Sequence, residues 1–309
     1  MKNIATGFYF SSSKLQAVEL SSEDKKYSIQ NISEVYFNEV LDFSSDKDSK
    51  ILEQLQTSYN EILLDFPVKA SSVSFALPND LFYVMQVPYD ISLKSEDLIK
   101  EFRWEFSVIY PYLDPEELAI QFIEIPKSNY MKHKTVIVIG VTKKYLQILN
   151  TFCKNNNLIL RHLEAPHIAA ERTFAASKQN LFNKIIFSIF ISNKDISIII
   201  SDNLRPVYFK LINDIDFNKI PEIIKEELNS NVLIDINIQN ADCCFVLSDS
   251  LNKTFLERLN IITDISFIPF NLADSLDFAS NLENSRYLQK ANTFSASAGA
   301  ALRLFRDLL

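Results

Sequence analysis

The order of predicted elements repeats once along the chain, and this repeat limits the fold more than any single motif does. The first half begins with three strand-like stretches within 3–37, and a helical stretch follows at 44–66. After a polar segment at 178–184, three more strand-like stretches occupy 185–212. A helix, a strand, a second helix and a last strand follow them. Two halves of similar order predict an α/β protein built from a duplicated unit.

The size and charge of the chain narrow its possible classes. Its 309 residues are 47% hydrophobic, which favours two domains, one over 1–180 and one over 181–309. The net charge of -8 and the lack of a long basic cluster argue against nucleic-acid binding. No apolar run reaches the roughly 18–20 residues of a membrane-spanning helix, and the first residues lack a signal-peptide layout. We therefore expect a cytoplasmic protein.

The chain contains only three glycines, at Gly7, Gly140 and Gly299. Loops that bind nucleotides commonly use glycine, because a residue without a Cβ lets the backbone approach phosphate closely. Three glycines are too few for several such loops.

The cysteines and histidines do not follow the spacing of a metal site or of a catalytic motif. The cysteines lie in apolar segments and the histidines are scattered, so we expect core or surface positions and no bound metal. These residues are Cys153, Cys243, Cys244, His133, His162 and His167.

Four stretches together carry a resemblance to a known family. They are "GFYFSSSKLQAVEL" from Gly7, the long segment from "VSFALPND" to "QFIEIP", the segment "VIVIGVTKKYLQILNTFCKNNNLILRHLEAPHIAAERTF", and "FSASAGAALRLF" near the end. In order and spacing they resemble the PilM branch of the actin-like ATPase superfamily, to which the cytoplasmic domain of GspL is related. The resemblance implies a two-domain actin-like (ribonuclease H-like) fold with an inserted subdomain at about 70–165.

The first phosphate loop of this family departs from the pattern in this chain. The family has an Asp that acts through the metal-bound water and a Gly that admits phosphate, and the matching positions here are Tyr9 and Ser11. An aromatic ring cannot replace a carboxylate as a ligand of Mg²⁺. Ser11, Ser12 and Ser13 retain hydroxyl and amide donors but supply no acid.

The two remaining nucleotide motifs are also altered. The second phosphate loop, Asp-Ile-Gly in the family, matches "FIS" with Phe190 and Ser192 at the acid and glycine positions. The glycine pair of the adenosine motif is replaced by Ser248 and Asp249. Without acid, metal site or glycine, nothing orients a phosphoryl transfer, so we expect a pseudo-ATPase with no nucleotide or metal cofactor.

The resemblance implies a scaffold in a type IV pilus or type II secretion machine. Its expected partner is the cytoplasmic tail of a bitopic inner-membrane protein of the PilN or GspM type, and a homo-oligomer stays open. An alternative is an active actin-like ATPase that uses ATP and Mg²⁺, with Asp195 or Asp202 as the acid near Ser11–Ser13. A second alternative is a filament-forming cytoskeletal protein.

Two further segments have functional interpretations. Aromatic and arginine side chains gather at Arg103, Trp104, Tyr110 and Tyr112, which suits a protein-binding surface. The C-terminal stretch "LRLFRDLL" has an apolar side that favours packing against the second domain over membrane attachment.

Overall fold

The computed structural model describes residues 3–24, 26–125, 134–192, 195–229, 241–248, 252–282 and 286–305. Its strands are β1 (Asn3–Phe10), β2 (Lys14–Glu23), β3 (Lys26–Tyr36), β4 (Ser72–Ala76), β5 (Phe82–Pro88), β6 (Leu118–Ile125), β7 (Thr135–Thr142), β8 (Ile159–Glu164), β9 (Ile185–Ser192), β10 (Asp195–Asp202), β11 (Arg205–Ile212), β12 (Cys243–Ser248), β13 (Ile268–Pro269) and β14 (Asp277–Phe278). Its α-helices are α1 (Asp48–Asp65), α2 (Ser95–Ile109), α3 (Lys143–Asn155), α4 (Pro166–Ala175), α5 (Ile220–Leu228), α7 (Lys253–Thr263), α8 (Leu272–Ser275) and α9 (Ser295–Leu302). Among the described residues, no helix is both long and apolar enough to cross a bilayer.

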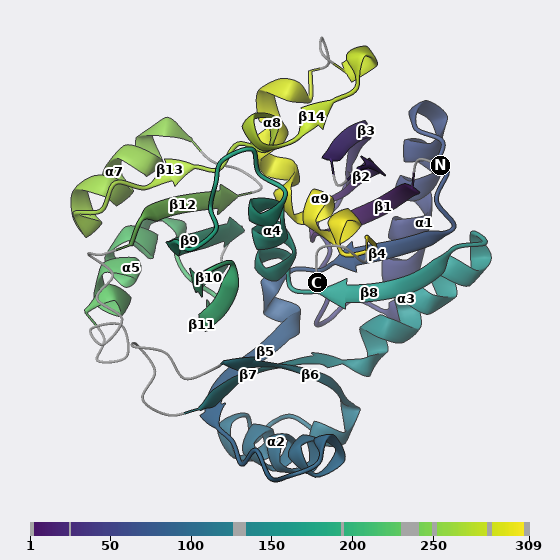
Figure 1. The fold of residues 1–309 in the computed structure, drawn as a ribbon. Helices are drawn as coiled ribbons and strands as arrows, with labels where there is room; N and C mark the ends of the chain where they lie inside the picture. The colour runs from purple at the N-terminus through teal and green to yellow at the C-terminus, as the bar shows by residue number, and fades with distance from the viewer. Residues whose placement is uncertain are drawn as a thin grey trace.

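Two large sheets have the same plan. The first runs β14-β3-β2-β1-β4-β8 and the second runs β11-β10-β9-β12-β13. In each, three consecutive antiparallel strands are followed by two strands that run parallel to the first of the three. Figure 1 shows the two sheets side by side, the first in purple to teal and the second in green. The duplication expected from the sequence is therefore present as a shared strand order.

The helix α1 covers the first sheet because its apolar residues recur every three or four positions. Ile51, Leu55, Tyr59 and Ile62 are all buried, as their spacing predicts, and Tyr59 packs edge-on to the ring of Phe8 in β1. The alternation of β1 directs Phe8 to this face and its neighbours Gly7 and Tyr9 to the opposite face.

A third, smaller sheet of order β5-β7-β6 lies below the first two in Figure 1, with α2 on its outer side. The residues of α2 that face this sheet, Leu98, Phe102 and Phe106, form a separate apolar cluster with Val136 and Val138 of β7. This layer is the inserted subdomain. The strands β4 and β8, which the predicted limits of about 70–165 include, pair with each other in the first sheet.

The helices α4 and α9 pack against each other between the two large sheets (Figure 1). At two contacts of α9 the backbones lie so close together that there is no room for a Cβ, and glycine is required. A Cβ on Gly299 would lie 1.6 Å from the carbonyl oxygen of Ala169 in α4, and one on Gly7 would lie 2.2 Å from the amide nitrogen of Ala301. Two of the three glycines thus allow backbones to touch, a packing use of glycine.

The end of the described chain returns to the first sheet, although the predicted division at 181 assigns it to the second half. β14 pairs with β3, and α9 packs over β1 and β2. Leu302 and Phe305 are buried there, with the ring of Phe305 against Tyr27 of β3. The C-terminal residues therefore pack, as expected, but against the first sheet and not the second.

Candidate functional site

The turn between β1 and β2 satisfies its own backbone. Ser11 is buried, and its hydroxyl accepts hydrogen bonds from the backbone amides of Ser13 and Lys14 at 3.3 and 3.1 Å. The amide of Ser11 in turn donates to the carbonyl of Lys14 at 2.9 Å. In a phosphate-binding turn such amides point at the ligand. Here a side chain of the turn accepts them instead.

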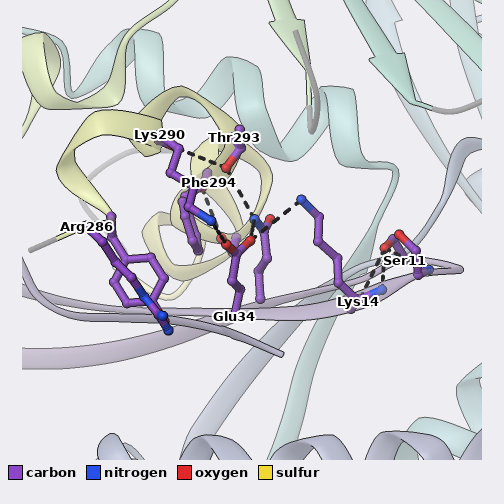
Figure 2. Close-up of polar contacts among 11 residues, drawn as sticks. Ser11, Lys14, Glu34, Arg286, Lys290, Thr293 and Phe294 are labelled. Atoms are coloured by element: carbon purple, nitrogen blue, oxygen red, sulfur yellow. Dashed lines mark hydrogen bonds and ion pairs between the residues drawn. The ribbon is translucent and has the colours of Figure 1, made fainter. Parts of the chain in front are cut away.

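The lysine of this turn is held by a buried carboxylate. Lys14 lies on the face of β2 that meets the C-terminal segment, and its Nζ is 3.8 Å from Oε2 of Glu34 in β3 (Figure 2). Lys290, from the 3-10 helix Leu288–Phe294, donates to the other oxygen of Glu34, and Gln16 donates to Oε2 at 3.2 Å. Burial by itself raises the pKa of Glu34, but the hydrogen bond from Lys290 and the charge of Lys14 outweigh it and lower the pKa overall. The ammonium of Lys14 therefore has a counter-ion within the protein.

The second sheet presents an aromatic ring at Phe190, the position that the resemblance matches to the family's second acid. Phe190 of β9 is buried edge-on against Tyr9 of β1, with ring centroids 6.3 Å apart. The hydroxyls of Tyr9 and Ser192 lie 3.4 Å apart. Tyr9 and Phe190 belong to one apolar cluster with side chains of α4, α9 and β12. The departures at Tyr9 and Phe190 thus meet across the junction of the two sheets and fill space there.

The remaining predicted positions divide between the junction and other places. Ser192 and Ser248 are buried at the ends of the neighbouring strands β9 and β12. Asp249 lies outside the described residues. Asp195 pairs with Ser192 and so lies at the junction end of β10, whereas Asp202 pairs with Ile185 at the other end. Seven residue steps along β10 separate the two aspartates by about 23 Å, so of the two only Asp195 lies at the junction end.

A buried polar network also joins the two halves. His167 of α4 hydrogen-bonds through its two ring nitrogens to the hydroxyls of Ser197 and Ser188, each at 2.8 Å. The hydroxyls of Ser188 and Ser201 donate to the two oxygens of Glu171 at 2.5 and 2.7 Å. Since β9 and β10 supply the serines and α4 supplies the other two groups, the network attaches this helix to the second sheet.

Burial sets the protonation of this network. It lowers the pKa of His167 to about 3 and raises the pKa of Glu171 to about 7, because a charge loses hydration inside the protein. His167 is thus the satisfied core histidine that the sequence predicts. His162 is half-buried on β8, and His133 lies outside the described residues. No group of three or more His, Cys, Asp or Glu side chains in the described ranges is arranged to hold a metal ion.

A groove lies on the other side of α4, between the inserted subdomain and the first sheet. Its cavity measures about 430 Å³. One wall consists of β6 and β7 residues, the other of β8, α3 and α4 residues, and Arg303 follows α9 at the edge. β6 and β8 are the outermost strands of their sheets within the described part of the chain. The groove therefore lies beside two outermost strands, and its cavity has both apolar and polar lining residues.

Strand alternation assigns the residues of β6 to two faces. Leu118, Ile120 and Phe122 pack toward α2, and Ala119, Gln121 and Ile123 line the groove together with part of Phe122. The sequence predicts a strand at β6, but its groove face was not among the predicted binding surfaces. The alternating stretch "LAIQFIEI" contained the signal, since both of its sides are largely apolar, as in a strand covered on two faces.

The four predicted partner residues lie on the α2 side of the subdomain and do not line the groove. Arg103 donates to the carbonyls of Pro115 and Leu118, and Tyr110 donates its hydroxyl to the carbonyl of Val84 at 3.1 Å. Both therefore support the subdomain from within. Trp104 and Tyr112 are exposed, at 63% and 73%.

The two matching sheets and the inserted layer define a two-domain actin-like fold, and solved structures agree. No protein-family profile matches the sequence, and no curated protein does so. A structure described as the PilM-PilN type IV pilus biogenesis complex aligns at a TM-score of 0.72 and 15% identity, covering 97% of this chain and 98% of that one.

Two further structures align less closely. The cytoplasmic domain of EpsL, an inner-membrane component of the type II secretion system of Vibrio cholerae, aligns at a TM-score of 0.50 and 12% identity over 88% of this chain and 98% of its own. A Bacteroides thetaiotaomicron protein with an actin-like ATPase fold and unknown function aligns at 0.50 and 12% over 94% and 95%. The PilM-like, actin-like fold expected from the sequence is confirmed.

Proposed function

We propose that the protein is a non-catalytic cytoplasmic scaffold of a type IV pilus or type II secretion-like machine. In this role it docks on the inner membrane by binding the cytoplasmic tail of a partner of the PilN or GspM type. The observation that carries the proposal is the groove between β6 and β8, in a chain that shares its fold along nearly its whole length with a protein of a PilM-PilN complex.

The groove suits an extended peptide for two reasons. A strand at the end of a sheet has unpaired backbone donors and acceptors, which a bound strand can satisfy. The cavity beside these edges is lined by apolar side chains such as Ile123, Ile139 and Leu163, which can receive alternate side chains of the peptide. A short tail that becomes ordered on binding loses conformational entropy, so moderate affinity is expected.

The contacts at the junction of the two sheets support the proposal that this scaffold does not hydrolyse ATP. Tyr9 and Phe190 occupy the positions of both acids, and Ser11 accepts the amides of its own turn. In-line phosphoryl transfer needs a bound metal and oriented phosphates. Asp195 is the acid that the alternative of an active ATPase retains, because it lies at the junction end of β10.

The direct test is site-specific photo-crosslinking in cells that produce the protein. Gln121 is exposed on the groove face of β6, so it is replaced by a benzophenone amino acid, with Trp104 on α2 as the matched control position. We expect Gln121 to crosslink to the cytoplasmic segment of a bitopic inner-membrane protein and Trp104 not to do so. Crosslinking from Trp104 alone would move the binding surface to α2 and reject the groove.

The nucleotide part of the proposal has its own test. Calorimetric titration of the purified protein with ATP and Mg²⁺ should give no heat, and millimolar nucleotide should not shift the unfolding midpoint. A micromolar affinity would favour the ATPase alternative, and replacement of Asp195 by Asn would then show whether this acid is used. Sedimentation at increasing protein concentration checks the filament alternative.

A further inference from the structure

The charges of the groove all lie on one wall. Among the described lining residues, those of β6 and β7 are uncharged, whereas the opposite wall and the adjoining end of α9 contain Arg161, Arg172, Arg303 and one acid, Glu164. The chain as a whole has a net charge of -8, so this local excess of arginine runs against its average. An excess of positive charge at the edge of a partly apolar cavity favours an anionic group in whatever binds there.

One arginine is neutralised within the protein. Arg172 of α4 donates from both terminal nitrogens to the two oxygens of Glu164, at 2.6 and 2.7 Å, and both side chains are largely buried. This paired geometry uses the strongest hydrogen-bonding arrangement that a carboxylate offers to arginine. The single negative charge of Glu164 is therefore already matched by Arg172 before Arg303 is counted.

Arg303 makes only a longer contact with the same carboxylate. Its Nε lies 3.6 Å from Oε1 of Glu164, beyond hydrogen-bond distance, and this buried atom makes no hydrogen bond within the described part of the chain. Loss of hydration lowers the pKa of Arg303, and the nearby Arg172 lowers it further while Glu164 opposes both. A partly dehydrated guanidinium with an incomplete counter-ion is stabilised by an added carboxylate.

The neighbouring groups on β8 do not supply that anion. Arg161 is exposed and donates from Nε to Ser72 at 3.3 Å, so it adds positive charge at the open side. Burial lowers the pKa of His162, with the charge of Arg303 as the next cause, which keeps this imidazole neutral near pH 7. Within the described lining of the groove, the positive charges of Arg161 and Arg303 thus remain after Glu164 has neutralised Arg172.

We propose that the peptide bound in the groove carries an acidic side chain that pairs with Arg303, with aliphatic residues beside it against the β6 and β7 wall. This inference rests on the proposed function and names the chemistry of its partner. The carboxylate would accept from the guanidinium of Arg303 in a charge-assisted hydrogen bond, and Arg161 would add long-range attraction. The uncharged wall would provide the apolar contacts, so the binding motif combines one acid with aliphatic neighbours.

The test selects random eight-residue peptides displayed on phage against the full chain. Groove peptides are those that no longer bind Ala119→Trp, a substitution that fills the cavity from the β6 side. We expect them to share Asp or Glu at one position next to aliphatic residues. Their affinity should fall about tenfold or more in Arg303→Gln, recover partly in Arg303→Lys, and weaken with added salt. Arg258→Gln is the matched control, because Arg258 is an exposed arginine of α7 paired with Glu222.

The outcomes separate this inference from the function on which it rests. If the groove peptides lack an acid, or bind Arg303→Gln as tightly as the wild type, the proposed acidic side chain is wrong. The groove would still be a peptide-binding site. A selection that yields no peptide sensitive to Ala119→Trp rejects the groove and the proposed function together. Tighter binding when the acid is replaced by phosphoserine would assign the site to phosphate and reject the carboxylate. Urea unfolding of each variant confirms that lost binding is not lost folding.

Discussion

The junction of the two large sheets and the groove beside the inserted subdomain differ in how their polar groups are satisfied. At the junction, the serines, His167 and Glu171 hydrogen-bond to one another, and Tyr9 packs on Phe190. At the groove, two strands end their sheets and Arg303 keeps a buried nitrogen without a hydrogen bond in the described residues. The comparison teaches that an actin-like fold can use its central junction for stability while its open polar groups lie elsewhere.

At the junction, we expect a large loss of stability from a substitution at the contact between α4 and α9. Gly299→Ala places a methyl group where the Ala169 carbonyl lies, 1.6 Å away, so the helices must separate. We expect a loss of about 3 kcal/mol or more in the free energy of unfolding, measured with urea. Gly140→Ala is the control, because its added methyl meets only the ends of Phe106 and Leu118, at 3.2–3.4 Å, and should cost about 1 kcal/mol or less.

The Tyr9 position tests whether the junction still tolerates the acid of the family. Tyr9→Asp puts a carboxylate in a fully buried site against Phe190, and we expect it to cost about 3–5 kcal/mol in the free energy of unfolding. Tyr9→Phe removes only the hydroxyl near Ser192 and should cost about 1 kcal/mol. If Tyr9→Asp were as stable as the wild type and bound Mg²⁺ and ATP, the junction would be an altered nucleotide site and the contrast with the groove would fail.

The buried network predicts opposing pH dependences. Glu171 has a pKa of about 7 in the folded protein, above its ordinary 4.5, so its contribution to stability falls as pH rises through this window. His167 has a pKa of about 3, below its ordinary 6.5, so its contribution rises with pH between those values. Between pH 4.5 and 6.5 the two slopes largely cancel in the wild type.

Single substitutions should separate the pH dependences that Glu171 and His167 give to the free energy of unfolding. Relative to the wild type, Glu171→Gln should gain about 2 kcal/mol in the free energy of unfolding between pH 4.5 and 6.5, and His167→Gln should lose a similar amount. Urea unfolding at several pH values measures both difference curves. Flat curves for both variants would mean that the two groups are hydrated, which the packed description of the junction does not allow.

The smallest effect is expected on the outer face of α2. Trp104 is 63% exposed, so Trp104→Ala should change the free energy of unfolding by about 0.5 kcal/mol or less. Crosslinking from Gln121 should be unchanged in this variant. A loss of crosslinking would show that the partner contacts α2 as well, and would restore the partner surface that the sequence alone predicts.

Local patterns account for what the sequence predicts correctly. The alternation of β1 and β9 and the helical spacing of Ile51, Leu55 and Tyr59 report which side of each element is apolar, and burial follows from that. The repeat of strand order predicts the duplicated sheets. These inferences succeed because they depend on residues that are neighbours in the chain.

The order of predicted elements and its resemblance to a known family therefore account for the two matching sheets and the inserted layer. The packing of the folded chain establishes three further contacts: Lys290 and Lys14 share Glu34, the C-terminal helix returns to the first sheet, and Arg303 borders β8. It also decided that the groove side of β6, and not the face of α2 that carries Trp104, adjoins the cavity. The reason is physical: these contacts join residues far apart in sequence, and their partners are fixed by how the sheets and helices pack.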